Sequence, residues 1–529
     1  MGLLPLCRSF IPLVLPKLSE KTLLIITVLV AGLCSIVYEL LISTTSAYFL
    51  GDSVKQFSLT IGTYMFAMGV GSFLSQYVRE RELTYFVGVE IVLGLCGGFS
   101  VPLLYLTFPD LDNNQFQYLT LLLTFVIGLL TGYEIPLLAR IMKKYYPLRS
   151  NLANVLGIDY LGALVATLLF PFILLPFLGL FRSSLLFGAV NVFLGLGIYF
   201  FFAERLSSRA KQTLFAAAVG VLLLFGLLWS RADKMLGELN AAAYPHPVIY
   251  GEQTPYQQLT LTQNNDDLRL YLDRVIQFSS KDEYRYHESL ALIPAAVAGR
   301  VNRALILGGG EGLLARELLK LPELQELHIV DLDEKVFDLA RRHAGLVQLN
   351  KDALRDPRVT THPEDAAIYL RNDEQSYDLI LADLPDPGNE SIARLYSDYF
   401  FNLARRRLTT DGVFATQATS PYHTSDAFWC INTTLYAAGF NETYPYRVNV
   451  PSFGLWGFVM ATQRPIDPEQ FRADVPTRFL DTATVNRLFE FPPDLKPTSE
   501  YAVNRLDRPV LLDYFLADWS KWQREKAVH

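Results

Sequence analysis

The chain is poor in cysteine. It has four cysteines in 529 residues, Cys7, Cys34, Cys96 and Cys430. No two of them form a CxxC pair or follow the spacing of a zinc site, and Cys34 and Cys96 lie in apolar segments. The sequence therefore predicts neither a disulfide framework nor a metal site.

Blocks of basic residues are also missing. The longest is Arg405-Arg406-Arg407, and the net charge is −7. Nucleic acid binding depends on clustered lysine and arginine side chains that neutralise phosphates. The composition therefore excludes nucleic acid as a partner.

What the chain has in excess is apolar sequence, which makes up 51% of its residues and is concentrated before about residue 230. Crossing the hydrocarbon core takes roughly 20 mostly apolar residues. We therefore predict a multi-pass α-helical membrane domain over residues 1–235, in the cell (inner) membrane. Pro5, Pro12 and Pro16 interrupt the apolar stretch at the N-terminus, so we do not interpret it as a removed signal peptide. The seven predicted spans are 21–43, 56–78, 84–107, 117–141, 152–179, 184–203 and 212–230.

Four acids, Glu39, Glu90, Glu134 and Asp159, lie within or near these spans. An ionised group is costly in lipid, so such residues face a partner or a cavity. Glu39 and Glu134 occur in similar settings, Tyr-Glu-Leu and Tyr-Glu-Ile, three segments apart. Two interpretations stay open: protonated acids that hold the helix bundle together, or a cation or proton site.

The side of the membrane on which the C-terminal half lies is left open by the sequence. The N-terminal arm and the loops near 79–82, 140–149 and 204–211 hold most of the basic residues, which places them in the cytoplasm. Seven spans would then put the C-terminal half outside. An enzyme that uses a cytoplasmic nucleoside is expected inside, so the two arguments conflict.

After about residue 250 the pattern becomes that of a water-soluble α/β domain. Residues 258–262 and 268–273 alternate like paired strands around a polar turn, and predicted strands then alternate with helices up to 379–382. This order predicts a Rossmann-like (methyltransferase-type) domain with a parallel sheet. We assign 245–290 to a small N-terminal β-strand subdomain, 291–480 to the Rossmann-like domain and 481–529 to a C-terminal extension.

A glycine-rich turn, 308–312, follows the apolar strand 304–307 and precedes a helix. Glycines at this place let the backbone approach a nucleotide-like ligand. Glu311 within the turn repels phosphate and attracts an amine, which indicates a nucleoside that carries a cation. Asp331, Asp365 and Asp383 follow successive strands, at the edge where such sheets bind ligands.

In residues 250–462 the sequence resembles the spermidine synthase family of polyamine aminopropyltransferases, and the membrane half resembles the N-terminus of its membrane-bound branch. The stretches that carry the resemblance are Tyr256-Gln257, 272–277, 282–288, the glycine turn with Arg316-Glu317, 331–333, 383–387, 395–397 and Gln417.

The resemblance implies an enzyme that transfers an aminopropyl group from decarboxylated S-adenosylmethionine, its co-substrate, to putrescine and needs no other cofactor. It implies Asp383 as the catalytic base. It also allows a homodimer. The residues implied to bind the donor and methylthioadenosine are Gln257, Gly308, Gly310, Asp331, Asp365 and Ala366. Those implied to bind the aminopropyl or polyamine chain are His287, Glu311, Asp386 and Gln417.

The sequence departs from the family at several positions. Glu311 replaces the usual Asp, Ala366 replaces a Gly, 388–390 lacks the usual Gly-Pro, and a Phe near 453 stands where many relatives carry a Tyr. These changes leave the polyamine acceptor open. The alternatives are a methyltransferase that uses ordinary S-adenosylmethionine, which Glu311 argues against, and a polyamine transporter or sensor, which the retained Asp383 and Asp386 argue against.

Overall fold

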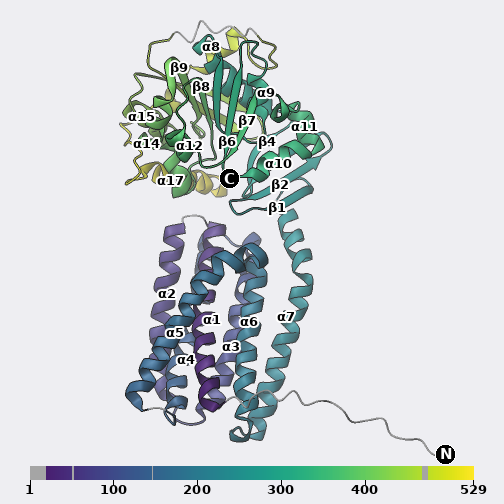
Figure 1. Ribbon diagram of the computed structural model, residues 1–529, viewed down its shortest axis with the longest axis vertical. Coiled ribbons are helices and arrows are strands. Elements are labelled where there is room, and N and C mark those ends of the chain that lie inside the picture. Colours follow the sequence, from purple (N-terminus) through teal and green to yellow (C-terminus); the bar gives the residue numbers. More distant parts are fainter. Residues whose placement is uncertain (1–18, 51–52, 146, 243, 467–474, 529) are drawn as a thin grey trace, which may run out of the picture. The chain divides into compact units, whose positions relative to one another are not determined.

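A computed structural model describes residues 19–50, 53–145, 147–242, 244–466 and 475–528 (Figure 1). The expectation for the arm that contains Pro5, Pro12 and Pro16 lies outside these residues. The chain divides into two compact units, Met1–Asn240 and Ala241–His529. The first is a bundle of long helices and the second is an α/β domain.

The bundle contains six helices long and apolar enough to cross a membrane, by length and composition within the described residues. One of them, Ser150–Phe201, has 52 residues and would be about 78 Å long at 1.5 Å per residue, far beyond one hydrocarbon core. It breaks at Gly179, whose φ of 68° and ψ of 177° are not helical. The break coincides with the end of the predicted segment 152–179, so the long run supplies two of the seven predicted segments. The helices of the bundle are α1 (Glu20–Leu50), α2 (Ser53–Leu74), α3 (Glu82–Thr107), α4 (Asn113–Met142), α5 (Leu148–Leu169), α6 (Leu175–Phe201) and α7 (Ser208–Ala242).

Three helix pairs form the bundle: α1 packs on α5, α2 on α4 and α3 on α6. Small residues allow the close approach. A Cβ at Gly162 of α5 would lie 2.2 Å from the carbonyl oxygen of Leu29, and a Cβ at Gly71 of α2 would lie 2.0 Å from that of Leu129. Close packing of this kind associates helices in lipid, where no hydrophobic force drives them together.

The second unit begins with a four-stranded antiparallel sheet of order β1-β2-β3-β4. The polar turn between β2 and β3 closes at the pair Asn264 and Asp267, with Asn265 in the left-handed region at φ 54°. Leucines on one face of this sheet pack on helices of the larger domain, including Leu313, Val336 and Leu346. The strands are β1 (Val248–Gln253), β2 (Gln258–Asn264), β3 (Asp267–Leu272) and β4 (Val275–Ser279).

The larger domain is a seven-stranded sheet of order β10-β11-β9-β8-β5-β6-β7, in which β5 to β9 are parallel, β11 is antiparallel to β9, and β10 is antiparallel to β11. The Rossmann-like fold expected from the strand and helix rhythm is present. Its strands are β5 (Arg303–Gly308), β6 (Glu326–Asp331), β7 (Val359–Pro363), β8 (Tyr377–Asp383), β9 (Leu408–Gln417), β10 (Glu442–Val450) and β11 (Gly454–Thr462).

Alternate residues of the central strands enter two separate apolar clusters, which is why both faces of the sheet carry helices (Figure 1). Ile306 belongs to one cluster and Leu307 to the other. The larger helices of this unit are α8 (Glu283–Ala298), α9 (Leu313–Leu318), α10 (Glu334–Arg342), α11 (Ala344–Asn350), α12 (Ala366–Asn372), α14 (Asp398–Arg406), α15 (Ser425–Ala437), α16 (Thr482–Leu488) and α17 (Val510–Val528).

The order of the strands reverses at β5. From β5 the chain moves outward through β6 to β7 and then returns to β8 on the other side of β5. The carboxyl ends of β5 and β8 therefore flank a topological switch point, where doubly wound sheets bind their ligands.

Candidate active site

The glycine turn brings the ends of β5 and β8 together. Gly308, Gly309 and Gly312 have positive φ values of 87°, 64° and 82°. A Cβ at Gly308 would lie 2.0 Å from the carbonyl oxygen of Asp383, so only glycine fits there. The turn therefore needs glycine both for its backbone conformation and for its contact with β8.

Asp331, at the end of β6, is tied to the glycine turn. Its Oδ2 accepts a hydrogen bond from the Gly310 amide (3.1 Å) and its Oδ1 accepts one from the Asp333 amide (3.0 Å). Burial, together with the nearby Glu311 charge, raises the pKa of Asp331 to about 6. The carboxylate is thus held in place beside the turn.

Gln257 comes from the small β subdomain and lies next to the same strand end. Its side-chain amide donates to Oδ2 of Asp333 (3.1 Å), and the Thr254 hydroxyl donates to the same oxygen (2.7 Å). The connection between β1 and β2 is therefore fixed to the residues that follow β6.

Asp365, at the end of the connection after β7, is the N-cap of α12. Its Oδ1 accepts from the amides of Ala367 and Ile368, and its Oδ2 pairs with Arg394 at 2.5 Å. Ala366 is the first residue of α12 and is buried. Asp365 and Ala366 therefore have well-defined positions, although much of the Asp365 carboxylate is already used within the chain.

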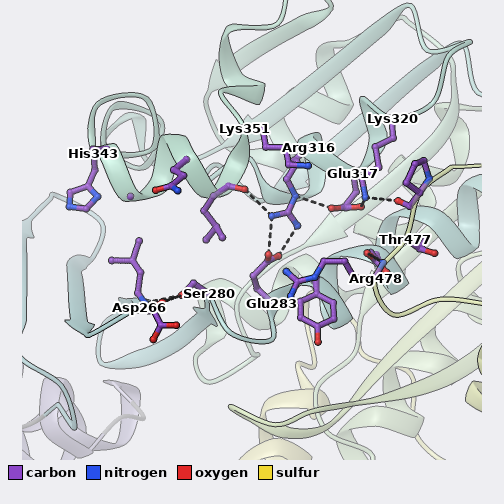
Figure 2. Close-up of a pocket in the computed structure, with 18 of the residues that line it drawn as sticks. Asp266, Ser280, Glu283, Arg316, Glu317, Lys320, His343, Lys351, Thr477 and Arg478 are labelled. Atoms are coloured by element: carbon purple, nitrogen blue, oxygen red, sulfur yellow. Dashed lines mark hydrogen bonds and ion pairs between the residues drawn. The ribbon is translucent and has the colours of Figure 1, made fainter.

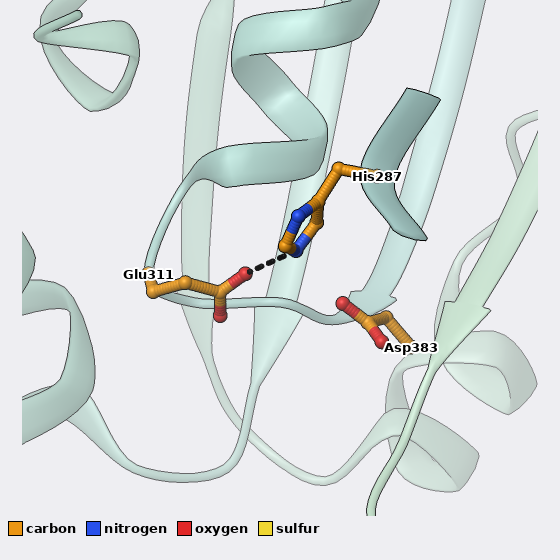
Figure 3. Close-up of side chains that lie close together, drawn as sticks. All are labelled: His287, Glu311 and Asp383. Carbon is orange, nitrogen blue, oxygen red and sulfur yellow. Dashed lines mark ion pairs between the residues drawn. The ribbon is translucent and has the colours of Figure 1, made fainter. Parts of the chain in front are cut away.

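His287 of α8 and Glu311 of the glycine turn face each other, with Asp383 beside them (Figure 3). The Nε2 of His287 lies 3.7 Å from Oε1 of Glu311, and its Nδ1 donates to the Glu283 carboxylate at 2.8 Å. Despite burial, which acts in the opposite direction, these two acids raise the pKa of His287 to about 10. His287 is therefore an imidazolium at neutral pH.

Glu283 in turn binds Arg316 of α9 through two hydrogen bonds of 2.9 and 2.8 Å. Hydrogen bonds from His287 and Arg316 lower the pKa of Glu283 to about 2, against the effect of burial. Arg316 also donates to Glu317 at 2.8 Å. A continuous chain of charges, Arg316–Glu283–His287–Glu311, thus runs through the protein interior to the glycine turn.

Asp383, the last residue of β8, accepts a hydrogen bond of 2.5 Å from the hydroxyl of Tyr286 on α8. The pKa of Asp383 is raised to about 7, because burial and the Glu311 charge outweigh the opposing effects of His287 and of the Tyr286 hydrogen bond. A carboxylate with a pKa near neutrality is suited to exchange a proton with a substrate.

Asp386 lies three residues further on, and its Oδ1 is buried without a hydrogen-bond partner in the described part of the chain. Burial raises its pKa to about 7. Gln417, at the end of β9, uses its amide within the chain: it donates to the Leu384 carbonyl (2.7 Å) and to the Tyr396 hydroxyl, and it accepts from the Thr419 amide (2.8 Å). Gln417 therefore holds the segment between Asp383 and Asp386 in place.

The turn between β10 and β11 lies against α8. Asp282 accepts hydrogen bonds from the amide and the hydroxyl of Ser452, at 2.6 and 2.8 Å. Phe453, the residue that departs from the family, makes an edge-on contact with Tyr286, with ring centroids 6.0 Å apart. An aromatic wall thus stands beside the Tyr286–Asp383 pair.

Potential ligand atoms of His287, Glu311 and Asp383 lie within 4.8 Å of one another, close enough to hold a metal ion. An imidazolium has no lone pair for a metal, and the pKa of His287 is about 10. The cluster is better suited to ammonium groups, which two carboxylates attract without any metal.

The Glu283–Arg316 pair also lines a cavity of about 900 Å³ (Figure 2). Lys320, Lys351 and Arg478 line it together with Asp266 and Glu317. Asp331, Asp383 and Asp386 are not among its lining residues. The acids expected to bind substrate therefore do not belong to this cavity.

Sequence reasoning gave no role to Glu283, Tyr286 or Arg316. Glu283, Tyr286 and His287 have the spacing of one helix face, which is a signal that they act together. Arg316 belongs to one of the stretches that carry the family resemblance. It lies 33 positions from Glu283, so no local pattern predicts their contact.

The chain is similar to proteins of known family. Residues 283–470 match the family model for the spermine/spermidine synthase domain. The chain is 40% identical to the polyamine aminopropyltransferase of Leptospira interrogans, over 95% of this chain and 99% of that protein. It is 41% identical to polyamine aminopropyltransferase 2 of Ralstonia nicotianae, over 94% and 98% respectively.

Two solved structures are also similar. A spermidine synthase in complex with the transition state analogue AdoDATO is 26% identical with a TM-score of 0.43, over 46% of this chain and 85% of that one. The spermidine synthase from Thermotoga maritima is 26% identical with a TM-score of 0.42, over 46% and 84%.

The fold and the acidic cluster at its switch point thus define a Rossmann-like transferase for a cationic substrate. The chain belongs to the polyamine aminopropyltransferase family. It is an aminopropyltransferase, and its reaction uses decarboxylated S-adenosylmethionine as a substrate and needs no cofactor.

Proposed function

We propose that the chain is a membrane-anchored enzyme that transfers the aminopropyl group of decarboxylated S-adenosylmethionine to putrescine, giving spermidine and methylthioadenosine. The observation that carries the proposal is the position of Asp383. It ends β8 at the switch point, its pKa is about 7, and it lies beside the Glu311–His287 pair. This is the environment that a base for an amine nucleophile requires.

The chemistry needs little more than placement of the two substrates. The nitrogen of putrescine attacks the propyl carbon next to the sulfonium. The new C–N bond forms as the C–S bond breaks, and the sulfur leaves as neutral methylthioadenosine. Because the leaving group is already activated, holding the amine in line provides much of the acceleration.

The attacking amine must lose one proton, because an ammonium nitrogen has no lone pair with which to attack. A primary amine of this kind has a pKa near ~10.4 and is mostly an ammonium ion at neutral pH. The Asp383 carboxylate accepts a proton as the C–N bond forms. Tyr286 donates to Oδ1 of this carboxylate, which orients it and stabilises its ionised form.

The other acids divide between the two substrates. On the donor side, Asp331 takes the ribose hydroxyls, with Gln257, Asp365 and Ala366 around the nucleoside. Glu311, balanced by the His287 imidazolium, binds the ammonium of the aminopropyl group.

On the acceptor side, Asp386 binds the far ammonium of putrescine. Support comes from its buried Oδ1, which has no partner among the described residues and which an ammonium would satisfy. Gln417 acts by holding the Asp383–Asp386 segment and not by contact with the amine.

The helical unit anchors the enzyme in the inner membrane as a multi-pass protein. Support comes from six apolar helices of sufficient length, one of which is broken at Gly179. A homodimer in the bilayer stays a prediction of the family resemblance.

Mass spectrometry of the products of the purified full-length protein tests the proposed reaction. The protein is given decarboxylated S-adenosylmethionine with putrescine, cadaverine, spermidine or agmatine, one at a time. Spermidine formed with putrescine as the preferred acceptor supports the proposal. A higher kcat/KM for another amine contradicts the choice of putrescine, and methylated products from ordinary S-adenosylmethionine contradict the reaction itself.

A further inference from the structure

The helical unit contains an internal repeat that the transferase reaction does not use. Residues 89–95 of α3 read VEIVLGL and residues 190–196 of α6 read VNVFLGL, and Glu90 occupies the same place as Asn191. Tyr133-Glu134 of α4 likewise corresponds to Tyr38-Glu39 of α1. We interpret helices α1 to α3 and α4 to α6 as two copies of one unit on these two matches.

The packing of the helices obeys the same relationship. Exchanging α1 with α4 and α2 with α5 converts the pair α1–α5 into the pair α4–α2, and both pairs are present. The third pair joins α3 to its own counterpart, α6. Because counterparts are three spans apart, the two copies cross the membrane in opposite directions. Transporters built from such inverted repeats bind their substrates near the middle of the membrane, where the repeats meet.

A buried polar group lies at the contact between the repeats. Nδ2 of Asn191 donates to Oε2 of Glu90 (2.9 Å), and the Tyr38 hydroxyl donates to Oδ1 of Asn191 (3.2 Å). The carboxyl of Glu134 lies close enough to that of Glu90 for the two to interact. Tyr38, Glu90, Glu134 and Asn191 come from four different helices, α1, α3, α4 and α6.

Both carboxyl groups are enclosed and incompletely satisfied. Glu90 is 0% exposed and Glu134 is 2% exposed. Oε1 of each has no hydrogen-bond partner in the described part of the chain. Buried polar atoms are nearly always paired, so an unpartnered oxygen on each of two interacting carboxyl groups indicates a place for a ligand that donates hydrogen bonds.

The groups that face the pair cannot supply a positive charge. They are Cys34 and Tyr38 of α1, Tyr64 of α2 and Asp159 of α5. Two carboxylates in contact and away from water cannot both be ionised, so the pair must hold a proton or another cation. An ammonium group can take the place of the proton, because it offers hydrogen bonds and a charge to the same oxygens.

We propose that Glu90 and Glu134, with Asn191, form a cation-exchange site at which a proton and an alkylammonium group of a polyamine compete, so that the helical unit exchanges polyamine for protons across the membrane. The site binds either a proton or the alkylammonium group, never both. If it opens alternately to the two sides of the membrane, each polyamine that moves one way is exchanged for protons that move the other way. The identity of the ammonium ion as a polyamine rests on the proposed function, whose reaction consumes and produces such amines.

Glu39 provides a matched control. It is the repeat counterpart of Glu134 and also lies in an apolar helix, but it is only partly buried and lies outside the Glu90–Asn191 network. A glutamine at position 39 removes the same charge from the same membrane domain without touching the proposed site.

The full-length protein is reconstituted into liposomes that contain a pH-sensitive dye, and spermidine is added outside. We expect the lumen to become alkaline at a rate that saturates with spermidine. Glu90→Gln and Glu134→Gln should lower this rate at least tenfold, and Glu39→Gln should stay within twofold of wild type. Aminopropyl transfer should be unchanged in all three. Asp383→Asn should lose transfer and keep the flux.

No spermidine-dependent pH change above that of empty liposomes, or an undiminished change in both Gln variants, overturns the proposal. An equal proton flux without spermidine also overturns it. If a Gln variant aggregates, the test uses Glu90→Asp and Glu134→Asp instead, which retain a carboxyl group. They should shift the pH of half-maximal flux, and an unshifted profile rejects the site. Flux from wild-type protein that shows no transferase activity leaves the site standing and rejects its link to the proposed reaction.

Discussion

Tyr286 and Asp383 are joined by a hydrogen bond of 2.5 Å, although 97 positions separate them in the sequence. Tyr286 lies in the first turn of α8 and Asp383 at the end of β8. Tyr286 is buried and Asp383 is partly exposed. Burial and the Asp383 charge raise the pKa of the tyrosine well above its usual value, so Tyr286 acts as a donor throughout the working pH range. The bond fixes which oxygen of Asp383 stays free for the substrate.

Asp383→Asn should lower kcat by ~10²–10⁴-fold, because the amide keeps the shape of the carboxylate and cannot accept a proton. The affinity for methylthioadenosine, measured by calorimetry, should stay close to that of the wild type. A kcat within threefold of wild type would show that Asp383 is not the base.

The rate should rise with pH around 7, because the Asp383 carboxylate must be ionised to take the proton and its pKa is about 7. Tyr286→Phe removes a hydrogen bond that lowers this pKa, so the acidic limb of the kcat profile should move to higher pH. Tyr284→Phe, two residues away on α8, is the control and should leave the limb in place. If the acidic limb lies at the same pH in wild type, Tyr286→Phe and Tyr284→Phe, Tyr286 does not lower the pKa of Asp383.

Glu311→Gln should weaken binding of the decarboxylated donor and reduce its advantage over ordinary S-adenosylmethionine. The carboxylate attracts the bare ammonium of the aminopropyl group and repels a donor that keeps its own carboxylate. Calorimetry with both nucleosides gives the ratio of the two affinities. An unchanged ratio would contradict the prediction.

Glu283→Gln should destabilise the protein, because Arg316 and the His287 imidazolium lose a shared buried partner, and breaking a buried ion pair costs roughly 3–5 kcal/mol. The wild-type pKa of His287, about 10, is above its ordinary value of 6.5, so its stabilisation is complete below pH 6.5 and is lost as the pH rises through about 10.

The difference in melting temperature between wild type and Glu283→Gln should therefore be largest between about pH 4.5 and 6.5. It should narrow towards pH 10, where His287 loses its charge, and towards pH 2, where Glu283 loses its own. Glu326→Gln, which removes the exposed partner of Arg303, is the control for loss of a surface pair. A difference that does not depend on pH would mean that His287 does not draw its charge from Glu283.

A truncated chain that begins at Ala241, the first residue of the second unit, should be soluble and active. The two sheets and their apolar clusters lie within this part, and about 290 residues are ample for a buried core. Activity is measured against the full-length enzyme with the same substrates. A folded, monodisperse truncation that binds methylthioadenosine and makes no product would show that the helical unit contributes to the active site.

Local patterns predicted much of the architecture. Apolar runs predicted the long helices, and the alternation of residues 258–262 and 268–273 predicted a hairpin that is present as β2 and β3. The sequence did not predict the last three strands of the large sheet, β9 to β11. Two of them, β10 and β11, form an antiparallel hairpin with no helix between them, and therefore fall outside the strand-and-helix rhythm on which the prediction depended.

The sequence by itself determined the glycine turn and the acids at the strand ends, because positive φ angles, strand patterns and the meeting of parallel strand ends are local or general properties. Only the tertiary structure decided which of these groups share a proton or a charge. Glu283 meets Arg316 across 33 positions, and Gln417 turns inward to Leu384 across the same distance. Such contacts, and the pKa values that they set, depend on how whole elements pack, and no short stretch of sequence specifies that packing.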